Sequence, residues 1–223
     1  MIEPRKVANR GIPAERPYVL WPNPRARKTV GDGSSLVGDH QVTGPGIPAS
    51  MRFALARHQD FMPKLEVSSD GAEAPLLSWD GVDGAQAYFI HGTMAGGENT
   101  IVMWSSSSDG YAGMELFDYL DNRQREQWTK SGTLLPADAR SCQVPREVAA
   151  ATGGTPMLQM IAYGAESTLS EPRPADAPRD WAPDWHVRVR NKSTAMVMPG
   201  AGAAEAPDAG ETAKSLLKGL FGN

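Results

Sequence analysis

Histidine and cysteine are the residue types in this chain best suited to metal binding or proton transfer, but their spacing does not assemble such a site. The four histidines are His40, His58, His91 and His186, and none stands in an HxH, HExxH or CxxH arrangement. His58 has Asp60 near it, yet both lie in an irregular stretch of sequence. We therefore expect surface or helix-capping roles for the histidines, and neither a bound metal nor a cofactor.

Nucleophilic catalysis has equally little support. Cys142 is the only cysteine, which excludes an intrachain disulfide and a zinc site made of several cysteines. Only Arg140 places a positive charge near it, so little in the sequence favours a reactive thiolate, and we expect Cys142 to be buried as a small apolar residue. Neither a GxSxG motif nor a phosphate-binding P-loop occurs. We expect no catalytic residue and no enzymatic activity.

One predicted strand carries positive charge on a single face. Arg188 and Arg190 alternate with Val187 and Val189, and successive side chains of a strand point to opposite faces. The cationic face either discourages pairing with other strands or contacts an anionic partner, such as a lipid head group, a polysaccharide or an acidic protein. The two arginines are therefore candidate partner-binding residues.

A second candidate is an apolar stripe near the end of the sequence. Asp208 and Glu211 have the spacing of a capping box, which predicts the start of a helix. One face of that helix, opposite its lysines, would carry Ala213, Leu216, Leu217, Leu220 and Phe221. About a dozen residues are too few to hold a helix in water without docking. The three leucines and the phenylalanine are therefore candidate partner-binding residues, and they dock on their own domain, on a partner protein or on a membrane surface.

The elements that would position these residues are mostly short strands. The chain is 40% apolar and contains 23 glycines and 18 prolines, a composition typical of strands joined by many turns. Apolar or alternating runs predict strands at residues 63–67, 76–79, 85–91, 100–104, 156–163 and 185–190. Residues 92–97 are expected to form a turn, and residues 134–136 and 141–145 a loop that crosses back.

One helix is expected between the fourth and fifth of these strands. Side chains spaced three and four residues apart predict it over residues 114–128, with Gly132 ending it. We expect Met114, Phe117, Leu120 and Trp128 to pack against the sheet, because residues 100–104 and 157–163 are apolar on successive positions and need cover on both faces.

Two of these strands resemble a known fold. The run Leu77-Ser78-Trp79, followed by Gly84-Ala85 and Tyr88-Phe89-Ile90, is similar to the second and third strands of fibronectin type III domains. Residues 160–167 resemble the late strand of that fold and its exit loop. The resemblance covers about residues 61–192 and implies a mainly β, immunoglobulin/fibronectin type III-like sandwich with a helical insertion at about 109–150. Residues 103–107 and 187–194 also resemble exported proteins of Gram-negative bacteria, which implies a bacterial cell envelope location.

The domain organisation follows from these elements. We expect an irregular segment over 1–60 lying on the domain, the sandwich with its insertion over 61–198, and a linker with a short amphipathic helix over 199–223. Within the first segment, residues 18–21 are a strand candidate, and residues 51–57 form either one helical turn or an extended lead-in.

For function, we expect a non-enzymatic binding or structural module that docks a partner through its C-terminal helix. A net charge of −4 and a pI near 5.6 argue against a nucleic-acid partner. The partner is a protein or a second copy, with a membrane surface or polysaccharide as alternatives. Two other functions stay open, namely an enzyme with a site built from dispersed loop residues and an accessory subunit of a larger complex. The first 17 residues lack an apolar stretch. We therefore expect the periplasm or cell envelope if a leader is missing from this chain, and otherwise the cytoplasm.

Overall fold

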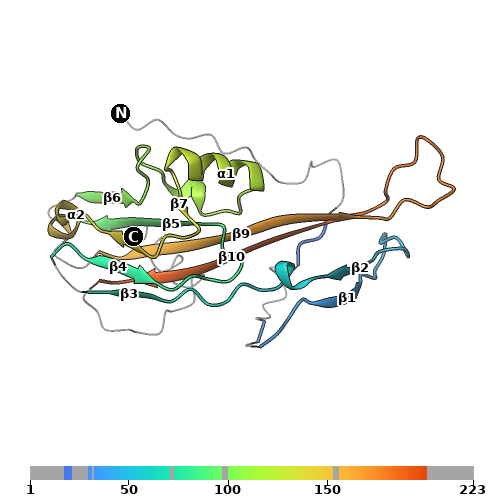
Figure 1. Cartoon of the computed structure of the whole chain (residues 1–223), viewed down its shortest axis with the longest axis horizontal. Helices are drawn as coiled ribbons and strands as arrows, with labels where there is room; N and C mark the ends of the chain where they lie inside the picture. Colours follow the sequence, from blue (N-terminus) through green and yellow to red (C-terminus); the bar gives the residue numbers. More distant parts are fainter. Residues whose placement is uncertain are drawn as a thin grey trace, which may run out of the picture.

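The computed structural model describes residues 18–21, 30–31, 33–70, 73–96, 100–152 and 156–199. These residues form a mainly β protein with three antiparallel sheets and few helices, which confirms the expected fold class (Figure 1). The C-terminal stripe, including Leu216, Leu217, Leu220 and Phe221, lies outside the described residues.

The largest sheet has the strand order β10-β9-β5-β6, and β7 adds to it by pairing with the start of β5. Its strands are β5 (Ala87–Ala95), β6 (Ile101–Ser105), β7 (Leu135–Pro136), β9 (Leu158–Ser170) and β10 (His186–Val197). Strand β5 is central, and residues 87–92 are all buried. Such a run of buried residues indicates that both faces of this sheet are covered.

A smaller sheet covers one face. It contains β3 (Val67–Ser69), β4 (Leu76–Trp79) and β8 (Ser141–Gln143), in the order β3-β4-β8. Leu77 and Trp79 of β4 contact Tyr88 and Ile90 of β5 in one continuous apolar core, and the ring centroids of Trp79 and Tyr88 are 5.5 Å apart. The two sheets therefore form a sandwich, and the expected core position of Trp79, 5% exposed, is confirmed.

Part of the insertion covers the other face of the large sheet, namely the 3₁₀ turn η2 (Met114–Leu116) and α1 (Asn122–Ser131). The short helix α2 (Arg146–Ala151) instead lies on the side of the small sheet, where Val148 packs against the first core. Leu116 and Leu120 are buried against Phe89 and Ile161, and Phe117 and Trp128 pack at the margin of this second core. The predicted packing of Phe117, Leu120 and Trp128 is therefore confirmed (Figure 1 shows α1 on the opposite side of the sheet from β3 and β4).

The predicted start of the helix was wrong. Asp121 caps α1, since its Oδ1 accepts a hydrogen bond of 2.6 Å from the backbone N–H of Gln124, so the helix begins eight residues later than expected. Met114 lies in the separate turn η2, and the structure does not describe its side chain. Gly132 ends the helix as predicted, with a φ of 82° that favours glycine.

Residues 33–60 form a small unit beside the sandwich. Strands β1 (Gly38–Gln41) and β2 (Arg52–Leu55) pair as a two-stranded sheet, and the 3₁₀ turn η1 (Arg57–Gln59) follows. The aromatic rings of Phe53 and Trp185 lie 6.2 Å apart, and Asn191 Nδ2 donates to the carbonyls of Gln59 and Asp60. Residues 51–57 are therefore mostly extended rather than a helical turn, while residues 18–21 do not form a strand.

Other strand boundaries also differ from the predictions. Residues 134–136 and 141–145 were expected to be loop, but they contain β7 and β8, which pair with β5 and β4. Residues 92–95 were expected to be a turn, but they continue β5 because Gly92 and Thr93 pair with β6. Strands β9 and β10 extend well beyond their predicted ends and form a long arm that projects from the sandwich (Figure 1).

A β-bulge lies at the base of this arm. Tyr163 pairs with Lys192 and Glu166 pairs with Arg190, so two β9 residues, Gly164 and Ala165, oppose the single β10 residue Asn191. Bulges increase the local twist and bend of a strand. The bulge therefore separates the arm from the part of the sheet within the sandwich.

Candidate functional site

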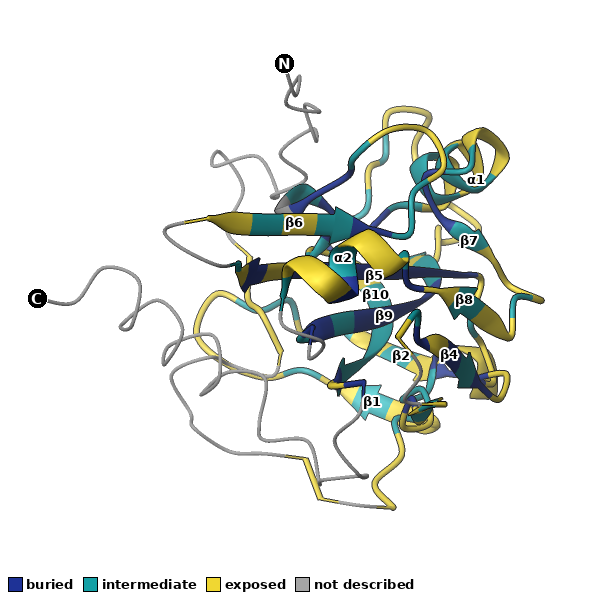
Figure 2. Cartoon of the chain, turned by 90° about the vertical axis from the view of Figure 1, so that its left-hand side faces the viewer, coloured by how far each residue is buried: buried dark blue, intermediate teal, exposed yellow. Residues whose placement is uncertain are grey.

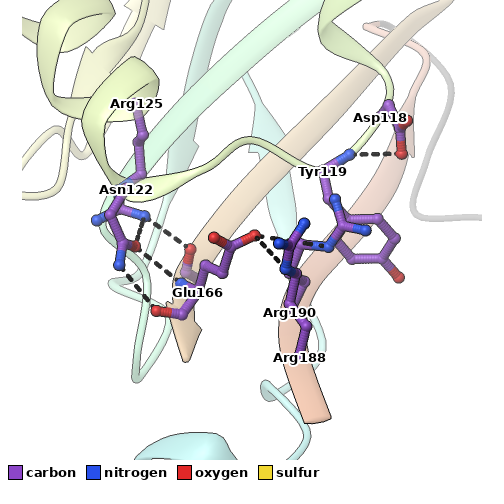
Figure 3. A network of polar contacts seen from close by, with 8 residues as sticks. Asp118, Tyr119, Asn122, Arg125, Glu166, Arg188 and Arg190 are labelled. Carbon is purple, nitrogen blue, oxygen red and sulfur yellow. Dashed lines mark hydrogen bonds and ion pairs between the residues drawn. The ribbon is translucent and has the colours of Figure 1, made fainter. Parts of the chain in front are cut away.

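The sequence singled out Arg188 and Arg190, and the structure places both on the arm, on one face of β10 (Figure 3). Their Nε atoms each lie 3.8 Å from Oε2 of Glu166, which projects from the neighbouring strand β9. The side chain of Arg190 is 23% exposed and that of Glu166 is 16% exposed, while Arg188 is 43% exposed. One half-buried carboxylate therefore faces both guanidinium groups.

An aromatic ring completes this cluster. The guanidinium carbon of Arg190 lies 5.4 Å from the ring centroid of Tyr119, and Nζ of Lys192 lies 4.8 Å from it, both within cation–π range. The Lys192 ammonium also donates to the carbonyl of Phe117. Burial lowers the pKa of Lys192, which the charge of Asp118 counteracts, and burial raises the pKa of Tyr119. The cluster thus attaches the segment before α1 to the arm.

Asn122, the first residue of α1, hydrogen-bonds the backbone of β9 with its side-chain amide, as the backbone of a neighbouring strand would. Its Oδ1 accepts from the N–H of Glu166 and its Nδ2 donates to the carbonyl of Glu166, each at 2.8 Å (Figure 3). Arg125, one helical turn on, donates to the carbonyl of Gly164. The cationic face is therefore occupied mostly by contacts within the molecule, and Arg188 is its most exposed guanidinium.

These contacts were not visible in the sequence. Arg188 and Arg190 were noticed because they alternate along one strand, whereas Glu166 and Tyr119 are more than 20 residues away from both. To predict these contacts, one must know which residues of β9 pair with which residues of β10, and the bulge shifts that pairing by one residue.

His91 is a further correction, because it is neither at the surface nor at a helix cap. It is 3% exposed on the insertion side of β5, with Nε2 2.8 Å from the hydroxyl of Tyr111 and its ring edge-on to Phe117 at 5.0 Å. Burial lowers the pKa of His91, against the opposing charge of Glu115. A buried, neutral imidazole bonded to a tyrosine is a packed core histidine. Its one sequence signal is its place in an apolar strand.

Cys142 was expected to be buried, and it is partly buried on β8, beside the sandwich core. Burial raises its pKa to about 11. The thiol is therefore protonated at neutral pH, and a thiolate nucleophile has no support at this position.

A hollow of about 490 Å³ lies between η1 and the bulge of the arm. Asp60 and Asp83 are the acids at its wall. Asp60 accepts hydrogen bonds from Ser35 Oγ at 2.7 Å and from the N–H of Leu36 at 2.6 Å. These bonds lower the pKa of Asp60, the Ser35 hydroxyl contributing most. The carboxylate therefore holds residues 35–36 against η1.

An uncharged apolar surface, which the sequence did not predict, lies at the opposite end of the large sheet from the arm. The register places Met103 opposite Thr93 and Ile101 opposite Ala95, on the face that also carries His91. Gln159 and Met196 share that face across β9 and β10, and Met198 follows β10 directly. We define the methionine face as Ile101, Met103, Met196 and Met198.

This face is exposed at its outer positions. Ile101 is 60% exposed, Met103 48% and Met198 40%, and the intervening residues of β5 and β9, Thr93 and Gln159, are uncharged. Figure 2 shows β6 at the free edge of the sheet with exposed residues at one end. The insertion covers the other end of the same face.

No group of three or more histidine, cysteine, aspartate or glutamate side chains in the described part of the chain has the geometry to hold a metal ion. No described helix has the length and apolar character needed to cross a membrane.

Comparisons with models of protein families, with curated protein sequences and with solved structures find no match for this chain.

Proposed function

We propose that this protein is a non-enzymatic protein-binding module that docks a partner through the methionine face and through the C-terminal stripe at Leu216, Leu217, Leu220 and Phe221. The partner is another protein or a second copy of this chain. The observation that carries the proposal is the exposure of Ile101 and Met103 on an uncharged edge strand. Contiguous exposed apolar surface on a folded protein marks an interaction site.

The two edges of the large sheet support this assignment by their contrast. Strand β10 carries Arg188, Arg190 and Lys192, and charged side chains protect an edge from pairing with other chains. Strand β6 has no charged residue and no proline, and among the described strands it pairs only with β5. An edge left apolar while its counterpart is charged is best explained by a partner that covers it.

We further propose that the sandwich is fibronectin type III-like and that it belongs to the bacterial cell envelope. The strand orders β3-β4-β8 and β10-β9-β5-β6 support the first point, since each sheet brings together strands that are distant in sequence. The second point is supported by the sequence resemblance at residues 103–107 and 187–194. Binding through an edge or one face of such a sandwich is compatible with many partners.

A photo-crosslinking amino acid at Met103 tests the binding proposal in the cells that produce the protein. The matched control places it at Val37, which is 51% exposed but lies outside the methionine face. We expect a discrete cross-linked product at Met103, absent at Val37, and lost when Ile101→Asp is added. Equal products at both positions, or none at Met103, would contradict the proposal. Loss caused instead by Arg188→Ala would assign the partner to the arm.

A further inference from the structure

We infer that the methionine face is the docking surface for residues 213–221 of the same chain. The inference rests on the proposed function, which names the methionine face and the C-terminal stripe as docking elements. Here the two elements bind each other within one chain. Partner binding would then require that this internal contact open.

The path of the chain brings the segment to this surface. Strand β10 ends at Val197, Pro199 is buried, and the exposed Met198 belongs to the methionine face itself. Eight residues, 200–207, then separate Pro199 from Asp208. A coil of that length reaches about 15–17 Å.

The dimensions of the surface match this reach. Three strand spacings separate β10 from β6, since β9 and β5 lie between them, which gives about 14–15 Å across the face. A helix over nine residues, 213–221, is about 13 Å long. The segment can therefore span the face from β10 to β6 without a longer linker.

The chemistry of the two surfaces is complementary. The stripe offers leucines and one phenylalanine on a single face, and the sheet offers three methionines and one isoleucine. Methionine side chains are flexible and polarizable, so they adapt to the shape of an apolar partner. On such a helix Lys214 would lie at the margin of the stripe and Lys218 farther from it, so both long side chains could keep their charge in solvent.

A disulfide-trapping experiment on the full chain tests this contact. In a Cys142→Ala background, Met103→Cys is combined with Leu220→Cys, which would lie near the β6 end of the helix, and the matched control combines Met103→Cys with Gly219→Cys on another side of the helix. Because a disulfide needs Cβ atoms about 4 Å apart, we expect the first pair to oxidise within one chain about tenfold faster than the second. Ile101→Cys replaces Met103→Cys if that variant melts at a lower temperature.

Each result decides between occupants. A disulfide that forms within the monomer at residue 220 and not at 219 supports the inference. A disulfide formed mainly between two chains would overturn it in favour of a second copy, and equal or absent oxidation of both pairs would overturn it altogether. If trapping fails while Met103 still cross-links a partner, the proposed function stands and only the assigned occupant is wrong. If Met103 also cross-links nothing, the proposed function fails with it.

Discussion

The indole of Trp79 lies between the two sheets against Tyr88, and its Nε1 has no hydrogen-bond partner among the described residues. Its removal leaves a large cavity in a close-packed core. We expect Trp79→Ala to lower the free energy of unfolding by about 3–5 kcal/mol in urea unfolding. Trp79→Phe should lower the free energy of unfolding by less than Trp79→Ala. The phenyl ring fills more of the cavity, and the substitution also removes a buried N–H group that makes no hydrogen bond to the described residues of the folded protein.

Trp21 provides the control for this measurement. It is 65% exposed, and we expect Trp21→Ala to change stability by no more than about 0.5 kcal/mol. A similar stability for Trp79→Ala and Trp21→Ala would show that Trp79 does not hold the sheets together.

His91 gives the fold a dependence on pH. Burial lowers its pKa below the ordinary value of 6.5, so the unfolded chain binds this proton at a higher pH than the folded one. Its contribution to stability is therefore complete above about pH 6.5 and is lost as the pH falls from there through the folded pKa, by at most about 1.4 kcal/mol per pH unit.

Urea unfolding at pH 7.5 and at pH 5.5 measures this effect. We expect the wild type to lose more stability between the two than His91→Gln, which keeps a hydrogen-bonding side chain beside Tyr111 but cannot take up the proton. Equal losses in both proteins would mean that other groups cause the acid sensitivity.

At the scale of elements, Asn122 joins α1 to the arm by pairing with the backbone of Glu166 as a neighbouring strand would. We expect Asn122→Ala to cost about 1–3 kcal/mol, because the two hydrogen bonds with Glu166 and the one that Arg125 donates to Asn122 Oδ1 are lost. Amide hydrogen exchange at Glu166 should become faster. Arg123→Ala changes the next, exposed residue of the helix and should leave both the stability and this exchange rate unchanged.

The sequence was a good guide where an element carries its own pattern. Leu76–Trp79 alternates between exposed and buried positions, and its strand was predicted at its observed boundaries. Strands β7 and β8 are two and three residues long, which is too short to show an alternation of apolar and polar side chains. They form because the backbones of β5 and β4 offer hydrogen-bonding partners.

The same distinction explains the errors at longer range. The spacing of Met114 to Trp128 fits a helix, but Asp121 stabilises a helix start at its own position and the residues before it remain irregular. Of the candidate site, the alternation of Arg188 and Arg190 was visible, whereas their attachment to Glu166 depends on the pairing of two distant strands. The methionine face was not predicted because its residues come from both edges of a four-strand path.

At the scale of the whole molecule, the described residues already build two apolar cores with a sheet between them. Among these residues Val197 is the last that belongs to a core, and Pro199 is also buried. We therefore expect deletion of residues 208–223 to change the melting temperature by less than about 3 °C, equivalent to about 1 kcal/mol for a protein of this size. Association through the stripe should be lost, whereas a partner should still cross-link at Met103, because the deletion uncovers the methionine face.

Two full-length variants separate the stripe from the rest of the segment. Leu220→Asp combined with Phe221→Asp should reproduce the loss of association, while Lys214→Ala combined with Lys218→Ala should not. A deletion that lowers the melting temperature by many degrees and keeps the association would show that the segment belongs to the fold.

The bulge in β9 has a consequence for how the arm can change shape. Because Gly164 and Ala165 together oppose Asn191, removing Ala165 would restore regular alternation and still leave Glu166 opposite Arg190. The strands on both sides of the bulge would keep every pairing that they have now, and only the bend between them would be lost. One extra residue in β9 therefore sets the direction of the arm relative to the sandwich. This direction can be altered without changing the contacts that stabilise the arm or the sandwich.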